Sequence, residues 1–186
     1  MSISYCGRFN PTRIDTSFER GRVGFRAVPG LRDYRFTSYW RVRGTVEEAY
    51  AALHDLASYP EWWPEVKEAT RVDDKTFALR CRSTLPYDLI FHTTQAVEDP
   101  SSGILEASMT GDLEGFSRWT IRPGPEGSVM RFDEEVTTNK RSLNLLAPIA
   151  RPAFKANHTL MMRHGEAGLR TFLAGLRLGR QLPPEL

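Results

Sequence analysis

The alternation of apolar and polar positions becomes regular at Tyr34. Phe36, Ser38, Trp40 and Val42 alternate with Thr37, Tyr39, Arg41 and Arg43. This period of two is typical of a strand with one buried face, and Gly44 ends it.

Two helical segments follow this strand. Thr45 and Glu48, three residues apart, form a capping-box signature, so a helix is expected to begin at Thr45. Val46, Tyr50 and Leu53 then share one helical face. A shorter helical segment is predicted over residues 56–63, and Pro64 closes it.

Six further strands are predicted between residues 66 and 136. They span residues 66–72, 77–82, 89–97, 104–109, 118–122 and 129–136. Turn residues separate them, and the segment 111–115 is expected to form a turn or bulge. The connections are too short for parallel crossovers, so the strands are expected to pair antiparallel. The register of strand 89–97 stays open, because the faces that carry Phe91 and His92 are equally apolar.

The C-terminal region is predicted to be helical. Pro148 and Pro152 should kink the helix or restart it. Beyond Pro152, apolar positions recur at helical spacing for about two dozen residues. These positions are Phe154, His158, Met161, Gly165, Leu169, Phe172 and Leu176. One long helix against a curved seven-stranded antiparallel sheet gives an α+β fold, and it encloses space that side chains need not fill.

Residues 1–33 differ from the rest of the chain. Arginines outnumber acidic residues there, and Gly21, Gly24 and Gly30 interrupt any periodicity. We expect a loosely held basic extension, followed by one domain over residues 34–180. The alternative is an arm that binds an acidic partner or an anionic surface.

Composition and spacing exclude several classes of protein. The 186 residues include 25 Lys+Arg and 23 Asp+Glu, a balance that does not suggest nucleic-acid binding. Cys6 and Cys81 have no metal or redox spacing, and the four histidines form no HExxH motif, so neither cofactor nor metal is expected. Without a long apolar run or an apolar block after Met1, we expect a cytoplasmic protein with no stable membrane insertion.

Three sequence segments resemble motifs of a known superfamily. Residues 56–64, which read LASYPEWWP, are similar to the helix-pair signature of polyketide cyclase/dehydrase-type proteins. Residues 111–119 and the segment from Asn157 to Glu166 are similar to motifs of an uncharacterised bacterial branch. Over residues 34–176 the chain therefore resembles the SRPBCC superfamily, the START-like helix-grip proteins. The resemblance implies a helix-grip fold and a cavity for an apolar molecule, and it does not imply one particular chemistry.

Eleven residues are candidates for contact with a ligand. They are Trp62, Trp63, Phe77, Leu79, Leu89, Phe91, Trp119, Phe132, Phe154, His158 and Met161. The sheet residues among them lie on apolar faces directed at the long helix. Each indole of Trp62 and Trp63 either fills the gap between the helices or lines the mouth of the cavity, because an indole combines a large apolar face with one donor.

His158 is the best candidate for chemistry. It shares a helical face with Gly165 and Phe172, where an imidazole could contact a ligand's polar end or move a proton near pH 7. The alternative is a histidine held by a structural acid or carbonyl. Glu134 falls on an apolar strand face and is expected to reach water at a strand end, or else to be buried with a partner. Asp112 and Glu114 are more simply explained as turn residues than as an acid pair.

Three functions remain open at this point. The first is a protein that binds or carries a small, mostly apolar molecule such as a lipid, polyketide or aromatic compound. The second is an aromatase/cyclase-like enzyme that acts on a polyketide-type substrate. The third is a scaffold that binds a protein partner.

Overall fold

The computed structural model describes residues 32–82, 87–139 and 147–181. The chain begins with β1 (Asp33–Val42), followed by α1 (Val46–His54), the short 3₁₀ helix η2 (Leu56–Ser58) and α2 (Tyr59–Trp62). Six more strands then precede one long helix, α4 (Ala147–Gln181). This order confirms the predicted α+β arrangement. The predicted extension falls almost entirely on residues 1–31, outside the described residues.

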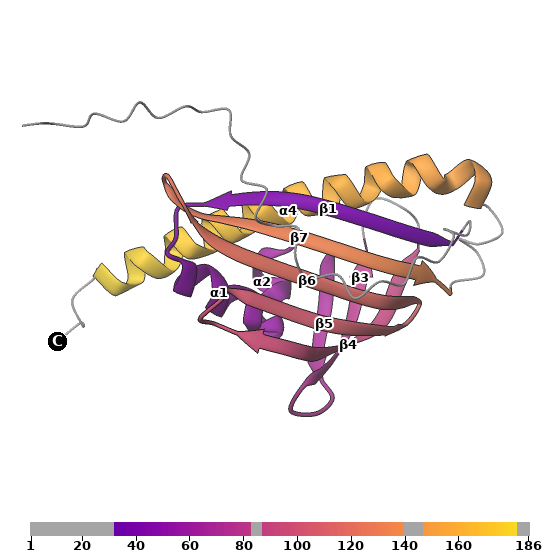
Figure 1. Ribbon diagram of the computed structural model, residues 1–186, viewed down its shortest axis with the longest axis horizontal. Coiled ribbons are helices and arrows are strands. Elements are labelled where there is room, and N and C mark those ends of the chain that lie inside the picture. Colours follow the sequence, from indigo (N-terminus) through magenta and orange to yellow (C-terminus); the bar gives the residue numbers. More distant parts are fainter. Residues whose placement is uncertain (1–31, 83–86, 140–146, 182–186) are drawn as a thin grey trace, which may run out of the picture.

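The sheet has seven antiparallel strands in the order β1-β7-β6-β5-β4-β3-β2. The strands after α2 are β2 (Val66–Arg71), β3 (Thr76–Arg82), β4 (Asp88–Asp99), β5 (Ile104–Gly111), β6 (Leu113–Gly124) and β7 (Gly127–Thr138). β2 to β7 form an antiparallel meander, and β1 pairs with β7 at one edge of the sheet. Figure 1 shows the curved sheet with α4 running along β1, and α1 and α2 near the C-terminal half of α4.

The capping box predicted at Thr45 is present. The Glu48 backbone N–H donates to the Thr45 hydroxyl at 3.2 Å, and the Thr45 N–H donates to a Glu48 carboxylate oxygen at 3.1 Å. Together they satisfy two of the donors left free at a helix start. Glu48 also accepts from the Arg177 guanidinium, which ties α1 to the end of α4.

Two boundaries differ from the sequence prediction, and the register that it left open in β4 is now fixed. Asp112 alone separates β5 from β6, since Gly111 still pairs with Phe91 on β4 and Leu113 already pairs with Thr138 on β7. In β4 the odd-numbered residues from Leu89 to Thr93 are buried and His92 is exposed, which fixes the register. α4 begins at Ala147 and runs through Pro152 without restarting, although proline removes one backbone donor from a helix.

The C-terminal half of α4 packs closely on the rest of the fold. Leu169 and Leu173 are almost completely buried, as is Trp40 on β1. A side chain at Gly168 would place its Cβ 1.7 Å from the Trp62 carbonyl oxygen, and one at Gly165 would meet the Trp63 ring at 2.6 Å. Glycine at both positions therefore permits this approach of α4 to α2 and β1. Among the described helices, none is both long and apolar enough to cross a membrane.

Candidate functional site

A cavity of about 160 Å³ lies between the concave face of the sheet and the N-terminal half of α4. Its floor includes Leu79 on β3 and the alternating residues of β4 from Leu89 to Val97. Phe132 and Glu134 on β7 form another part of the wall, and α4 covers the space. The wall is mostly apolar and aromatic, and its volume resembles that of a cavity of about 150 Å³ known to hold a benzene-sized molecule.

Nine of the eleven candidate residues line this cavity. They are Trp63, Leu79, Leu89, Phe91, Trp119, Phe132, Phe154, His158 and Met161. Trp62 and Phe77 are buried but do not line it. Phe77 lies at the start of β3 with the Arg71 guanidinium 4.7 Å from its ring centre. Phe77 and Leu79 share one face of β3, but only Leu79 lies where the strand borders the cavity.

The two neighbouring indoles have different surroundings. Trp62 packs against Phe172 of α4, and its indole N–H donates to the Ser58 hydroxyl at 3.3 Å. Trp63 lines the cavity and donates its N–H to the Met161 carbonyl oxygen at 3.1 Å. One indole thus fills the space between the helices, while the other forms part of the cavity wall.

His158 and Glu134 form a polar pair in the cavity wall. The His158 Nε2 lies 3.0 Å from a Glu134 carboxylate oxygen, and the two side chains are 14% and 9% exposed. The imidazole also stacks on Phe36, with ring centres 3.7 Å apart. Phe36 and Glu134 are cross-strand neighbours on β1 and β7, so His158 rests on two adjacent residues of one sheet face.

This arrangement corrects the expectation for Glu134. It lies inside β7 rather than at a strand end, and it is buried. The alternative holds, a buried acid with a partner. For His158, the acid partner that the sequence left open as an alternative is present, although the ring still borders the cavity.

The surroundings of the cavity suppress ionisation of nearby weak acids. Burial raises the pKa of the Cys81 thiol to about 12, and the negative charges of Glu134 and Glu65 add to the effect. Cys81 is therefore a neutral, apolar part of the cavity wall. Tyr59, whose pKa burial also raises, donates its hydroxyl to the Leu53 carbonyl at 2.7 Å.

The cavity reaches the surface near α1 and β4. There His54 on α1 contacts Glu98 on β4, with the imidazole Nε2 3.0 Å from the carboxylate, and both side chains are partly exposed. Val97, another lining residue, is 41% exposed. No sequence pattern marked this end of the cavity. His54 lies one turn after Tyr50 on α1 and stacks on its ring.

Asn157 was also missed as a lining residue. It is 9% exposed and donates to the Met161 sulfur at 3.4 Å. Its place one residue before His158, on the edge of the same helical face, was the available signal.

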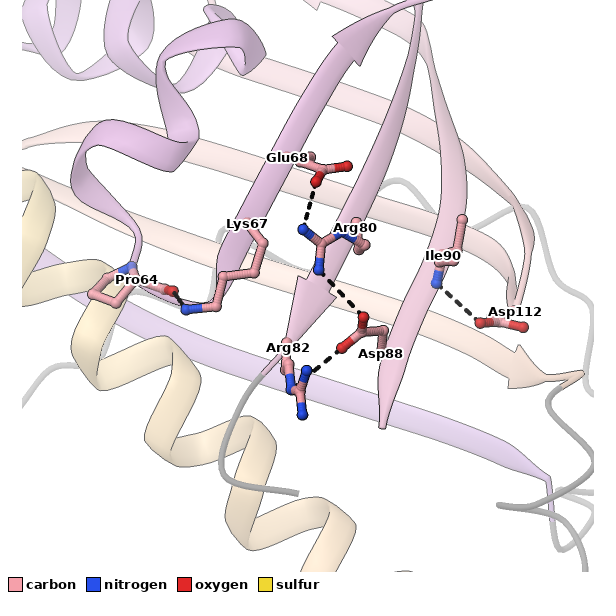
Figure 2. Close-up of polar contacts among 8 residues, drawn as sticks. All are labelled: Pro64, Lys67, Glu68, Arg80, Arg82, Asp88, Ile90 and Asp112. Atoms are coloured by element: carbon pink, nitrogen blue, oxygen red, sulfur yellow. Dashed lines mark hydrogen bonds and ion pairs between the residues drawn. The ribbon is translucent and has the colours of Figure 1, made fainter. Parts of the chain in front are cut away.

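Asp112 and Glu114, considered in the sequence as an acid pair, lie outside the cavity. Asp112 accepts from the Ile90 backbone N–H at 2.9 Å, and Glu114 accepts from the Asn139 amide at 3.0 Å, so they do not act as an acid pair. Figure 2 shows the convex face, where Arg80 bridges Glu68 and Asp88 and Arg82 approaches Asp88. His164 on α4 lies 2.6 Å from the buried Glu65.

The described residues contain no group of three or more His, Cys, Asp or Glu side chains arranged to hold a metal ion. The site is thus described by its apolar wall, its surface opening and the Glu134–His158 pair.

Comparison with solved structures identifies the same fold in several proteins. A START superfamily protein from Mycobacterium smegmatis matches with a TM-score of 0.59 and 18% identity, over 77% of this chain and 98% of that one. The Zhui aromatase/cyclase from a Streptomyces species matches with a TM-score of 0.58 and 12% identity, over 77% and 93%. At these identities the likeness extends to the fold alone.

A two-domain protein gives a third match. The di-domain ARO/CYC protein StfQ, from the steffimycin biosynthetic pathway, matches with a TM-score of 0.55 and 18% identity. The match covers 77% of this chain and 53% of StfQ, so the chain spans about half the length of that protein.

No curated protein matches the sequence. A family model does: the model described as "Polyketide cyclase / dehydrase and lipid transport" matches residues 33–171, most of the chain and all seven strands. The superfamily resemblance drawn from the three motifs is thereby confirmed, and the chain belongs to the polyketide cyclase/dehydrase and lipid transport family of helix-grip proteins.

Proposed function

We propose that this protein binds a small, mostly apolar molecule in the cavity between the sheet and α4. The single observation that carries the proposal is the cavity itself, about 160 Å³ with a largely apolar and aromatic wall and an edge at the surface. A folded chain does not retain such space for stability, because unfilled apolar volume lowers the free energy of unfolding. The family's description, which includes lipid transport, agrees with this function.

The proposed contacts are the nine candidate residues that line the cavity. Trp63 and Trp119 would offer aromatic faces to the ligand, and Met161 would cover it from α4. Trp62 and Phe77 are not part of the proposal, since they lie in the packed core.

A second candidate function is an aromatase/cyclase-like activity on a polyketide-type substrate. The observation that favours it is the Glu134–His158 pair, because a carboxylate that holds an imidazole beside an apolar pocket is suited to general acid–base chemistry. In that reaction His158 would remove a proton from the carbon between a carbonyl and a hydroxyl-bearing carbon. A C=C bond would form as the C–O bond to that hydroxyl breaks, and His158 would return the proton to the departing hydroxyl, which leaves as water. Glu134 would orient the ring and stabilise its protonated form.

The third function, a scaffold for a protein partner, has less support. The exposed large apolar residues of the described chain come from several elements: Tyr39 from β1, Val72 beyond β2, Ile90 and Val97 from β4, and Leu176 and Leu178 from the end of α4. A partner surface would gather such residues on one face.

Binding is tested with a neutral fluorescent probe, N-phenyl-1-naphthylamine, and one space-filling substitution. Leu79→Trp fills part of the cavity floor, while Ala78→Trp on the same strand points to the convex face and serves as the matched control. We expect Leu79→Trp to weaken probe binding and Ala78→Trp to leave it unchanged. Equal affinity in all three proteins would place the probe elsewhere and contradict the proposal.

Carrier and enzyme are separated by a second experiment. Native mass spectrometry of protein from its own host identifies any co-purified molecule, which is then incubated with the purified protein. A carrier returns the molecule with its mass unchanged, whereas a cyclase/dehydrase returns a product that has lost water.

A further inference from the structure

The polar groups of the cavity are unevenly distributed. Where β1, β7 and α4 form the wall, the buried Glu134 carboxylate lies 3.0 Å from the His158 Nε2, and Phe36 covers one face of the imidazole. Ser117 on β6 is the other cross-strand neighbour of Glu134 and also lines the cavity. These polar groups lie together in the wall, and a ligand that fills the cavity would meet them.

The contact with Glu134 determines what the imidazole can offer. A carboxylate accepts hydrogen bonds and cannot donate them, so the Nε2 of a neutral His158 carries the hydrogen. The Nδ1 is then an acceptor, and it has no hydrogen-bond partner among the described residues. A cavity ligand would therefore meet an acceptor at this ring, which calls for an O–H or N–H donor.

The charges around the cavity disfavour an anionic ligand. The described residues that line it include two acids, Glu134 and Glu106, and no lysine or arginine. Glu106 is bound by Arg118, with its carboxylate 2.6 Å from the guanidinium Nε, so that cation is already engaged. A carboxylate ligand would have to leave water and approach Glu134 without a described counter-charge.

From these observations we infer that the ligand is a neutral aromatic molecule with a hydroxyl group, which donates its O–H to His158 while Glu134 acts as a positioning residue. The inference rests on the proposed binding function and specifies its ligand class. An aromatic ligand suits this wall because the wall is itself aromatic. The ring centres of Trp119 and Phe132 lie 4.6 Å apart, and Phe132 also stacks with His158. A phenolic hydroxyl is uncharged at pH 7, unlike a carboxylic acid.

Three compounds of one shape test this inference on the full wild-type chain: naphthalene, 2-naphthol and 2-naphthoic acid, titrated by calorimetry at pH 7. We expect 2-naphthol to bind about tenfold more tightly than naphthalene, the effect of one net hydrogen bond. We expect 2-naphthoic acid to bind about tenfold more weakly than 2-naphthol or not at all. Equal affinity for naphthalene and 2-naphthol, or preference for the acid, would overturn the inference while leaving apolar binding intact. Failure of all three to bind would instead contradict the proposed function.

Variants assign the preference to the pair. His158→Phe should reduce the ratio of 2-naphthol to naphthalene affinity to about one, with naphthalene affinity retained. Glu134→Gln preserves the shape and removes the negative charge, so 2-naphthoic acid should bind at least about threefold more tightly than to wild type. His164→Phe is the matched control, because His164 also contacts a buried glutamate but does not line the cavity.

The ligand ratios separate a role in recognition from a purely structural role. A purely structural role would lower the affinity for all three compounds together and leave their ratios unchanged. Should His158→Phe fail to fold, the wild-type series and Glu134→Gln still decide the question. An unchanged preference in both His158→Phe and Glu134→Gln would overturn the assignment.

Discussion

The two halves of α4 perform different tasks against the same sheet. In the C-terminal half, Leu169 is completely buried and the glycines at 165 and 168 allow the helix backbone to approach the tryptophans of β1 and α2. In the N-terminal half, Phe154, His158 and Met161 cover an open cavity. One continuous helix thus joins a packed region to a hollow one.

The packed half is also fastened by polar contacts to the edge of the sheet. Glu166 accepts from the Arg41 backbone N–H at 2.8 Å, and Arg170 donates to the Arg41 carbonyl at 2.7 Å. These bonds satisfy backbone groups that an edge strand leaves unpaired. The comparison teaches that stability is concentrated in one half of α4, which leaves the other half available for ligand recognition.

The largest expected effect comes from closing the space at Gly168. Gly168→Ala would place a methyl group on the Trp62 carbonyl oxygen, and a backbone atom cannot move aside without displacing α2 or α4. We expect the free energy of unfolding to fall by more than about 3 kcal/mol. Chemical denaturation measures it.

Gly175→Ala is the matched control on the same helix. Nothing lies within 4 Å of a Cβ at Gly175, so alanine should stabilise the protein by about 0.5–1 kcal/mol through its helix propensity. Destabilisation by both substitutions would mean that α4 does not approach α2 as described.

Truncation of one apolar side chain in each half should give the next largest effect. Leu169→Ala removes a fully buried side chain and should lower the free energy of unfolding by about 2–5 kcal/mol. Met161 is partly buried and already borders open space, so Met161→Ala should lower it by less than about half as much. Equal losses, measured by thermal and denaturant unfolding, would show that the two halves pack alike.

Much of the fold was predictable because its signals are local. The alternation from Phe36 to Val42 and the capping box at Thr45 depend on residues a few positions apart, and both were confirmed. The start of α4 was not predictable in the same way. Pro152 is locally unfavourable in a helix, and nothing in its neighbourhood indicates that the helix continues through it.

The sequence predicted most of the residues that line the site, but not which of them contact each other. Leu79 and Phe91 were identified because a period of two marks their strand face. Phe77 shares this signal but lies beyond the cavity, and Trp62 of α2 lies in the packed core, since sequence does not show where packing ends. The Glu134–His158 contact joins residues 24 positions apart on different elements, and only the register of β7 and the rotation of α4 decide it.

Removal of one member of the buried pair should have an intermediate effect. His158→Phe leaves the Glu134 carboxylate without its imidazole partner, so the free energy of unfolding should fall by about 1–3 kcal/mol. The double substitution Glu134→Leu/His158→Phe should recover most of that loss, because an apolar pair needs no hydrogen bond. A double variant less stable than His158→Phe alone would show that Glu134 has a structural role apart from His158.

The smallest effect concerns the reactivity of Cys81, which lines the cavity. It shows whether this wall is apolar although the cavity opens to the surface. The thiolate is the reactive form of cysteine, and a thiol with a pKa of about 12 is ionised to about one part in ten thousand at pH 8. In a Cys6→Ser variant, whose remaining thiol is Cys81, we expect iodoacetamide at pH 8 to label the native protein far more slowly than the same protein in denaturant. Mass spectrometry over time gives both rates. Because the pKa is raised in the folded state, native labelling should accelerate as the pH increases above 8. Rapid native labelling at pH 8 would mean that water and charge reach this wall, and that the cavity is less suited to an apolar ligand than its lining indicates.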